Sequence, residues 1–314
     1  MLAYIIRRIL QVIPVLIGTS LILFLLMRVI PGDPVRLMTG ERAMEPKRYE
    51  KISRDLLLDR PLHVQYVNFM KRLAHGDLGT SYQKGRKVTT ILKEKYPNSI
   101  RLAFAAIIVE LVIGIGVGII SAIRRYSFLD TLATLSTSLA VSIPVFWLGM
   151  MLQIIFGLTL DWLPISGMGD GSLQYYILPS ITLAAVSTAY VARIMRSQLL
   201  EVNQQDYIRT AYAKGLSTSS VVMKHSFKNA LIPVITFIGL DLGFLMGGAI
   251  VTETIFSWPG MGYEIYSAIL QRDHPVVLGG VMVLVLAFIV INLLIDISYA
   301  FIDPRIRYGS QENS

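Results

Sequence analysis

The sequence predicts an all-α integral membrane protein that has six transmembrane helices and a small external helical subdomain. Composition carries the first part of this prediction: 54% of the 314 residues are hydrophobic and 16% are charged, and the mean hydropathy is +0.58. Soluble globular chains carry about 25% charged residues, so this chain has too little polar surface for water. In addition, the charges divide it into apolar runs of roughly 20 residues, the length that crosses a bilayer as a helix.

Six apolar runs are long enough to be transmembrane spans. The first, Ile9–Met27, is too long for the apolar part of a cleaved signal peptide, and no small-residue cleavage site follows it. The third run is the longest and contains Pro144, which predicts a kink or a re-entrant start. The five runs after the first are Leu102–Ile123, Thr131–Leu160, Ile177–Val191 (extended to about Met195), Asn229–Thr252 and Pro275–Ile295.

Lysine and arginine in the short loops indicate that both termini are cytoplasmic. Arg124 and Arg125 lie between the second and third spans, and the segment from Arg196 to Lys228 is also basic, whereas the loop 161–176 contains no lysine or arginine. The long segment 31–101 is rich in basic residues, although this orientation places it outside. Loops longer than about 60 residues largely escape the rule, so we keep the orientation.

These spans divide the chain into four parts. Residues 1–30 form the N-terminus and the first span, 31–101 an external helical subdomain, 102–308 a five-helix membrane core, and 309–314 a tail. Two amphipathic helices are expected in the external subdomain, and Gly76 is placed to end the second one. The subdomain either caps the helix bundle or offers a docking surface to an external partner. The apolar positions of the two helices are Tyr49, Ile52 and Leu56, then Tyr66, Phe69, Met70 and Leu73.

The cytoplasmic loop 197–228 predicts a compact knob with a tight bend. Residues 206–214 favour a short helix, Gly215 follows it, and Ser217 is a suitable N-cap for the next helix. Small side chains here would let a groove of another protein approach the backbone closely. They belong to Ala211, Ala213 and Gly215.

Several classes of site are excluded by residues that the chain lacks. There is no cysteine, which rules out a disulfide framework, a thiolate metal site and a cysteine nucleophile. No phosphate-binding loop of the G-x-x-x-x-G-K-[ST] type occurs, so this chain is not expected to bind ATP. The four histidines are divided between the outer and inner sides, which argues against a metal site. We therefore expect no catalytic residues, no metal and no cofactor.

Two alternatives follow from charge and from membrane chemistry. The net charge of +8 would suggest nucleic acid in a soluble protein, but in a membrane protein it reflects loops that face anionic lipid. An intramembrane protease would need paired polar catalytic groups within the spans, and few candidates are present. Neither alternative is favoured.

Two carboxylic acids lie inside predicted spans and are candidates for function, because burying a charge in the bilayer is costly. Glu110 interrupts the second span, and Asp241 lies midway along the fifth. Asp241 points away from a ridge of three glycines that permits close helix packing. Either acid could line a pathway, and Asp241 could equally make a structural hydrogen bond to a neighbouring helix. The glycines are Gly239, Gly243 and Gly247.

Short motifs along nearly the whole chain resemble those of one known family. RTAYAKG (209–215) is similar to a Glu-Ala-Ala-x-x-x-Gly loop, with Arg-Thr in place of Glu-Ala. DYIRTAYAKGL (206–216) and KHSFKNALIPVIT (224–236) extend the likeness. Together these motifs resemble the ABC importer permeases of the dipeptide, oligopeptide and nickel family, whose loop docks onto an ATPase subunit. Further matching motifs are PGDP (31–34), LDRPLHVQY (58–66), HGDLGTSY (75–82), ETIFSWPGMG (253–262), RDHPVV (272–277) and DPRIR (303–307).

The resemblance implies a type I ABC importer permease fold and a transport role. The chain would be the transmembrane permease subunit of an ATP-driven, binding-protein-dependent importer in the cytoplasmic (inner) membrane. Its solutes would be dipeptides or oligopeptides, with nickel or metal chelates or glutathione as alternatives. The resemblance implies a second, homologous permease that completes the pathway as a heterodimer, and two ATP-binding cassette ATPases that bind ATP and magnesium. It also implies an extracellular or periplasmic solute-binding protein. Membrane lipid is a further partner, and no nucleic acid is expected.

The resemblance also implies candidate site residues. On the outer side, the subdomain and the ETIFSWPGMG loop would face the binding protein, with Tyr66, Trp258, Pro259 and Gly260 at this surface. Tyr212 stands where the peptide branch often has a basic residue. The residues implied for the ATPase-coupling loop are Arg209, Thr210, Ala211, Ala213, Gly215, Leu216 and His225.

A self-sufficient secondary transporter or channel is the alternative from a different class. Such proteins usually contain inverted repeats and interrupted helices with coupling-ion ligands. No internal repeat occurs in this sequence, which favours the importer permease.

Overall fold

The computed structural model describes residues 2–29, 35, 49–50, 53–54 and 57–302. Among them the regular structure is helical, and β pairing is limited to an isolated bridge between Thr80 and Lys87. The chain forms two compact units: unit 1 consists of Met1–Asn98 and Pro259–Ser314, and unit 2 of Ser99–Trp258. These units differ from the divisions expected from hydropathy, because helices from distant parts of the sequence pack together.

The helices of the described residues account for the predicted membrane spans. A bent pair, Phe128–Ser142 with Val145–Thr159, changes direction by 108° and, taken as one span, corresponds to the third predicted run. The prediction of a helical multi-pass membrane protein is therefore confirmed. The five single spans are Leu10–Met27, Val88–Ile123, Gln174–Val202, Thr218–Met246 and His274–Ile295.

Pro144 accounts for the bend. Helix α7 (Phe128–Ser142) ends two residues before it, and Ile143 leaves helical geometry, because a proline disfavours the helical conformation in the residue that precedes it. Helix α8 (Val145–Leu152) restarts immediately and continues into η2 (Gln153–Thr159), a π-helical segment. The kink predicted at Pro144 is confirmed.

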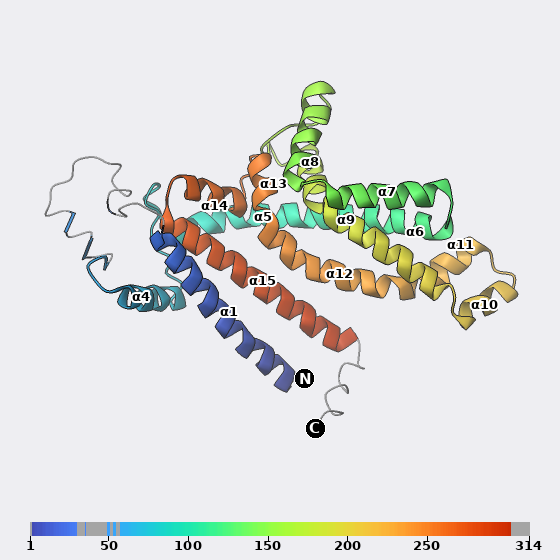
Figure 1. Cartoon of the computed structure of the whole chain (residues 1–314), viewed down its shortest axis with the longest axis horizontal. Coiled ribbons are helices and arrows are strands. Elements are labelled where there is room, and N and C mark those ends of the chain that lie inside the picture. The colour runs from blue at the N-terminus through green and yellow to red at the C-terminus, as the bar shows by residue number, and fades with distance from the viewer. Residues whose placement is uncertain (1, 30–34, 36–48, 51–52, 55–56, 303–314) are drawn as a thin grey trace. The chain divides into compact units, whose positions relative to one another are not determined.

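Unit 1 is built on two long helices that pack together, α1 (Leu2–Val29) and α15 (His274–Ile302). Figure 1 shows them antiparallel, so the beginning of α1 and the end of α15 lie at the same end of this unit. A shorter helix, α14 (Met261–Leu270), packs on α15. This arrangement is expected of a first and a last span whose outer ends lie on one side of a membrane.

Helix α4 (Leu62–Ala74) is the second helix predicted for the external subdomain. Gly76 closes it as expected, with a φ of 72°. The N–H groups of Gly76 and Asp77 each donate to a carbonyl oxygen in the last turn of α4 at 2.9 Å, which is the hydrogen-bond pair of a glycine C-cap. The first predicted helix, over 49–56, lies partly outside the described residues.

Helix α5 (Val88–Val109) starts earlier than the hydropathy pattern indicates. The sequence predicts an external subdomain up to residue 101, whereas the helix begins at residue 88 and passes Pro97 without a break. Backbone hydrogen bonds form within the helix whatever the polarity of the side chains, so a helix can continue beyond its apolar part. It then passes into η1 (Glu110–Gly114), a π-helical turn, and α6 (Ile115–Ile123).

Unit 2 is organised around α9 (Gln174–Val202). Helices α6, α7, α8 and α12 (Phe227–Gly248) pack against it, as does η1. Burying an aliphatic side chain fully contributes about 1.5–3 kcal/mol, so the apolar cluster around α9 is a large part of the stability of this unit. The cluster consists of Ala122, Val191, Met195, Leu199, Val222, Ala230, Val234 and Ile238.

Two glycines let the second span approach α9 closely. A Cβ atom at Gly118 would lie 2.7 Å from both the Ala192 carbonyl oxygen and Met195 Cβ, and one at Gly114 would lie 2.7 Å from Val191 Cγ1. Neither distance leaves room for a methyl group. The two glycines are spaced by four residues, the pattern that permits close helix packing in membranes.

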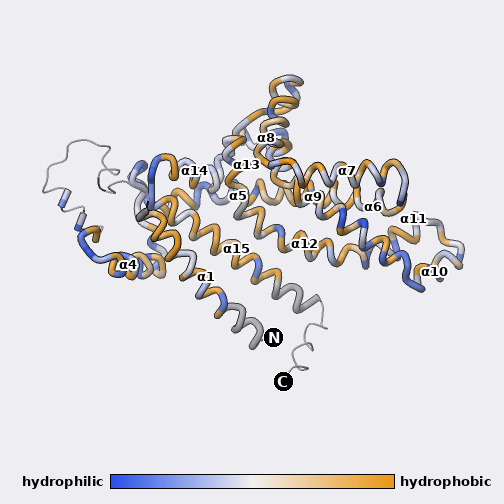
Figure 2. Tube along the Cα trace, in the orientation of Figure 1, coloured by the Kyte–Doolittle hydropathy of each residue, from blue (hydrophilic) through white to orange (hydrophobic). Residues whose placement is uncertain are grey.

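Hydropathy differs along the helices. Figure 2 shows hydrophobic residues along most of α15 and α12, and hydrophilic residues gathered near α10 (Asp206–Ala213). Large apolar side chains are exposed on the spans, such as Ile108 at 61% and Phe244 at 65%. Apolar surfaces of this kind are unfavourable in water and suit contact with lipid or with another membrane subunit.

We expect Gly118→Ala to destabilise the protein and Gly116→Ala to leave its stability unchanged. The methyl group at 118 would collide with the backbone of α9, and overpacking of this kind costs about 1–3 kcal/mol. A Cβ atom at Gly116 has nothing within 4 Å. The thermal midpoint of the protein purified in detergent measures both effects, and equal midpoints for the two variants would contradict the close packing at Gly118.

Candidate functional site

The loop between α9 and α12 folds into a compact element, residues 203–226, which we call the knob. It contains α10 (Asp206–Ala213), α11 (Thr218–Ser220) and η3 (Val221–Ser226). Helix α10 matches the short helix predicted from the sequence. Ser217 caps α11 as predicted, because its hydroxyl oxygen accepts a hydrogen bond from an N–H of the first turn.

Gly215 makes the bend of the knob. Its φ is 80°, in the left-handed region that glycine adopts without strain. Its N–H donates to the Tyr212 carbonyl oxygen at 2.9 Å, and the Leu216 N–H donates to the Ala211 oxygen at 3.4 Å, as in helices that end at a glycine. The predicted bend at Gly215 is confirmed.

Ala211 is buried inside the knob, which corrects its predicted place on a docking face. Its side chain packs with Ile208, Val221 and Val202, and only 6% of Ala211 is exposed. Ala211 lies three residues after Ile208, so the two side chains share one face of the helix. The sequence could not distinguish the two positions, because an alanine fits equally well at a close-approach surface and in a small core.

The other residues implied for coupling lie on the surface of the knob. Leu216, for example, is 38% exposed. A partner can therefore reach them, and their role in docking stays a prediction. The exposed members of the predicted set are Arg209, Thr210, Ala213, Gly215, Leu216 and His225.

A side-chain hydrogen bond joins the knob to α12, and apolar packing joins it to α9. Ser226 Oγ donates to Asn203 Oδ1 at 2.6 Å, which ties the two ends of the knob together, and Val202 at the end of α9 packs on the apolar cluster inside the knob. Asn229 Nδ2 in the first turn of α12 donates to the Tyr207 hydroxyl at 2.7 Å. Side-chain contacts therefore hold the knob against both helices, in addition to the backbone that connects it to them.

A buried ion pair fixes the end of α9 that precedes the knob. Arg196 Nε and Nη2 each lie 2.8 Å from one carboxylate oxygen of Asp130, the bidentate geometry of strong arginine–carboxylate pairs. The Ser121 hydroxyl donates to the same carboxylate, as does the Tyr126 N–H at 2.9 Å. Only 6% of the Asp130 side chain is exposed. Helices α6, α7 and α9 therefore meet at one carboxylate.

The residues predicted to face an external binding protein are mostly turned inwards. Trp258 is fully buried and packs edge-on against Tyr176, with ring centroids 4.8 Å apart. Gly260 is buried and Pro259 is half-buried. Tyr66 points at α1, where its hydroxyl donates to a carbonyl oxygen at 3.2 Å. Aromatic residues in a motif fit an interface and a core equally well; here Trp258 is part of the core and Tyr66 is half-buried.

Two sequence motifs of unit 1 meet at Asp273. Ser81 Oγ donates to Asp273 Oδ2 at 2.5 Å, and the Tyr82 N–H donates to Oδ1 at 3.0 Å. Asp273 is 2% exposed, so these bonds replace the water that its carboxylate loses. HGDLGTSY and RDHPVV, which are far apart in the sequence, therefore form one structural contact, to which Lys84 adds an ion pair with Glu264 on α14.

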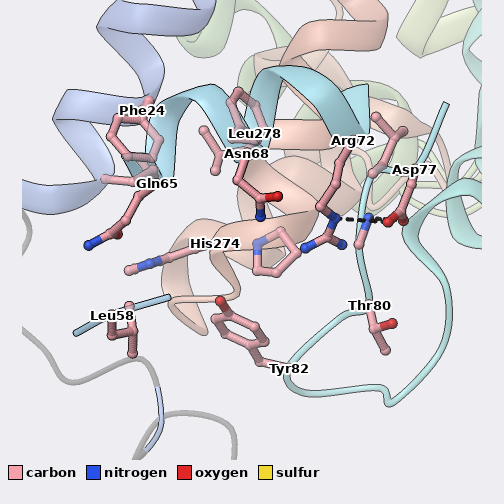
Figure 3. Close-up of a pocket in the computed structure, with 15 residues that line it drawn as sticks. Phe24, Leu58, Gln65, Asn68, Arg72, Asp77, Thr80, Tyr82, His274 and Leu278 are labelled. Carbon is pink, nitrogen blue, oxygen red and sulfur yellow. Dashed lines mark hydrogen bonds and ion pairs between the residues drawn. The ribbon is translucent and has the colours of Figure 1, made fainter. Parts of the chain in front are cut away.

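A cavity of about 320 Å³ in unit 1 is bounded by α1, α4, the start of α15 and the segment 77–82. Figure 3 shows Arg72 and Asp77 joined at one end and Leu58 and Gln65 at the other. Arg72 Nε lies 2.8 Å from Asp77 Oδ2, and this guanidinium holds the pKa of Asp77 below its ordinary value. Because the two charges compensate each other, the cavity offers hydrogen-bonding groups without a net charge from this pair.

The structure brings together the two carboxylic acids that lie inside spans. Glu110 begins η1 and Asp241 lies on α12; their carboxyl groups lie against each other, and Ser187 of α9 lies beside Asp241. Glu110 is fully buried, and neither of its carboxyl oxygens has a hydrogen-bond partner of ordinary geometry among the described residues. The sequence named no neighbour for Glu110, and the structure identifies Asp241. A role of the pair in a pathway stays a prediction.

Several of these residues were not singled out from the sequence. For Asp130 a signal was present, because Ser127 and Asp130 have the spacing of an N-cap and its third helical residue, and Ser127 does cap α7. Arg196 counted only as a loop charge. For Asp273 and Ser187 no local pattern identifies a partner, since their contacts depend on the tertiary fold.

Two family models together match nearly the whole chain. Residues 114–308 match the family described as binding-protein-dependent transport system inner membrane component. Residues 1–103 match the N-terminal family of such membrane components.

Individual relatives are similar along their full length. The dipeptide transport system permease protein DppB of Alkalihalophilus pseudofirmus is 42% identical over 98% of this chain and 100% of its own length; DppB of Escherichia coli is 38% identical over 98% and 99%. The glutathione transport system permease protein GsiC of Salmonella typhimurium is 40% identical over 98% and 100%.

A solved structure supports the fold. An inward-facing structure of the methionine ABC transporter MetNI superposes with a TM-score of 0.55 at 17% identity, over 68% of this chain and 97% of that one. At this identity the likeness concerns the fold alone. Taken with the family matches, it places this chain in the family of inner membrane components of binding-protein-dependent transport systems.

Proposed function

We propose that this chain is a permease subunit of an ATP-driven importer of dipeptides in the cytoplasmic membrane. The observation that carries the proposal is its similarity, over 98% of the chain, to the permeases of two dipeptide transport systems. Glutathione is the second candidate solute, because a glutathione permease is 40% identical over the same share. Both candidates are small peptides, so they make similar demands on a pathway.

We infer four kinds of partner from this role. A second, homologous permease would complete the pathway as a heterodimer, and the exposed apolar side chains of unit 2 are suited to such a neighbour. Two ATPase subunits would bind ATP and magnesium on the cytoplasmic side. A solute-binding protein would deliver the peptide from outside. Lipid would cover the remaining apolar surface of the spans.

The knob is the element that we propose couples ATP hydrolysis to transport. Movement of the ATPase subunits has to reach the spans through cytoplasmic protein, and the knob is attached to two of them. Its hydrogen bond with Asn229 of α12 and its packing against Val202 of α9 support a joint displacement of α9 and α12. The exposed surface around Gly215 would be the part that enters the ATPase.

We expect Gly215→Asp to abolish uptake while the protein stays in the membrane. A side chain at a φ of 80° costs about 1 kcal/mol or more, enough to displace the bend but not to unfold the spans. The measurements are uptake of a labelled dipeptide by cells, retention of the purified ATPase subunits by membranes, and the amount of permease in those membranes. Wild-type uptake by normally inserted Gly215→Asp protein would show that the knob does not couple.

Substitutions at two neighbouring residues distinguish a defect in docking from a defect in the folding of the knob. Tyr212 is exposed and Ala211 is buried, so Tyr212→Lys should leave uptake close to wild type. Ala211→Arg forces a charge into the apolar cluster, which costs several kcal/mol, and it should reduce ATPase retention as strongly as Gly215→Asp. Normal retention by Ala211→Arg would mean that the packing of the knob is not needed for docking.

Transport by the reconstituted importer tests the identity of the solute. The chain is purified with the second permease, the ATPases and the binding protein encoded beside it, and the complex is placed in lipid vesicles. With ATP on the side of the ATPases and the binding protein on the other, we expect accumulation of labelled Ala-Ala that unlabelled dipeptides compete away. Accumulation of glutathione without accumulation of dipeptides would show that the solute is glutathione.

Topology is tested with epitope tags. Tags before residue 1 and after residue 314 should both be accessible only from the cytoplasm, because the antiparallel pair of α1 and α15 begins and ends at the same end of unit 1. A tag inserted after Arg60 should be accessible from outside. An external C-terminal tag would refute the arrangement of six spans.

A further inference from the structure

A cavity of about 550 Å³ lies in unit 2 between α8, α9, α12 and α13 (Ile250–Ile255). Sites for small organic molecules typically measure about 300–1,000 Å³ and have mostly apolar walls with a few polar groups. This cavity fits both criteria. Its aromatic wall residues are Phe146, Tyr190, Phe237 and Phe244.

Asp241 is the single acidic or basic residue among the described residues that line this cavity. Its Oδ2 atom is buried and has no hydrogen-bond partner among the described residues. Ser187, which lies beside it, also lines the cavity. Asp241 thus brings a carboxyl group to the wall of an otherwise apolar chamber, and the chain covers its Oδ2 atom without pairing it.

Behind this wall lies Glu110, which is fully buried and whose carboxyl group lies against that of Asp241. No lysine, arginine or histidine of the described residues forms an ion pair with either acid. Two carboxylates side by side would repel each other strongly in a water-poor environment, so the pair keeps one proton and carries a single negative charge. No cation among the described residues compensates this remaining negative charge.

The missing charge suits an organic cation better than a metal ion. Calcium takes six to eight oxygen ligands, and among the described residues no group of three or more histidine, cysteine, aspartate or glutamate side chains could hold a metal. An ammonium group needs only two or three acceptors for its N–H groups. The aromatic walls would add an attraction for a cation over their ring faces.

We propose that this cavity holds the peptide during its passage and that Asp241, with Glu110 behind it, binds the protonated amino terminus of the peptide. The inference rests on the function proposed above. The α-amino group of a peptide has an ordinary pKa near 8 and is mostly charged at neutral pH, so it supplies the absent cation. The amino terminus is common to all dipeptides, so this contact holds the solute without selecting its side chains, which face the apolar walls.

Binding to the purified complete importer, in detergent and without its binding protein, tests the proposal. The probes are Ala-Phe, Ala-Phe amide and N-acetyl-Ala-Phe, followed by saturation-transfer NMR of the phenyl protons. Ala-Phe and its amide should bind, and the acetylated peptide, which lacks the ammonium group, should bind about tenfold more weakly. Asp241→Asn should remove this preference and Asp241→Glu should keep it. Asp161→Asn, the same change at an exposed aspartate outside the cavity, should behave like the wild type.

Equal binding of Ala-Phe and N-acetyl-Ala-Phe to the wild-type importer would overturn the proposal, and so would an unchanged preference in Asp241→Asn. Should Asp241→Asn fail to assemble, the comparison of the three probes on the wild type decides alone. Uptake of Ala-Ala by the reconstituted wild type is measured separately. Uptake without preferential binding refutes the amino-terminus site only, whereas absence of any peptide uptake refutes the proposed function.

Discussion

The ion pair between Arg196 and Asp130 is the contact on which the inner part of unit 2 depends. A carboxylate with 6% exposure is unfavourable unless its oxygens are fully paired, and here a bidentate guanidinium, the Ser121 hydroxyl and a backbone N–H supply the partners. These donors come from α9, from α6 and from the turn before α7, so the pair fixes three helices at one point. Since α9 leads directly into the knob, a force on the knob acts on a helix whose base is held by its neighbours. The three helices can then move as one body.

Helix α9 also borders a second acidic site, where no cation of the described residues compensates the charge. Ser187 precedes Arg196 by nine residues, roughly 13 Å along a helix axis, and lies beside Asp241. At Asp130 the chain supplies the cation itself, whereas at Asp241 and Glu110 it supplies none among the described residues. The first arrangement stabilises the fold, and the second, in the role that we propose, leaves an acidic pair for a cation from outside. The two parts of α9 therefore differ in charge compensation: the part at Arg196 stabilises the fold, and the part at Ser187 borders the site that we propose for a solute.

The sequence predicted those features that a single residue determines. Pro144 disfavours helical geometry in the residue before it and Gly215 permits a left-handed turn, so the bend and the knob followed from local chemistry. Predictions failed where the outcome depended on which face of an element becomes buried: Ala211 and Trp258 were assigned to surfaces and are part of the core. Pairs that are distant in the sequence, such as the contact of Ser81 with Asp273, need the tertiary fold, because neither residue carries a local pattern that names its partner. The role of the knob in docking rests on the resemblance of its motif and awaits experiment.

The incomplete wall of the cavity in unit 2 suits the transport pathway that we propose for it. Three of the four aromatic residues that line it are exposed, Phe146 at 51%, Tyr190 at 42% and Phe244 at 65%, so one chain forms only part of the wall. A chamber enclosed within a single close-packed core could release a solute only by unpacking that core, and packed interiors tolerate little deformation. When a neighbouring subunit forms the remaining wall, rigid helices can slide along the interface and open the chamber while both cores stay intact. The close contacts at Gly114 and Gly118 and the exposed aromatic wall are therefore two parts of one arrangement, in which rigidity within the subunit allows movement between subunits.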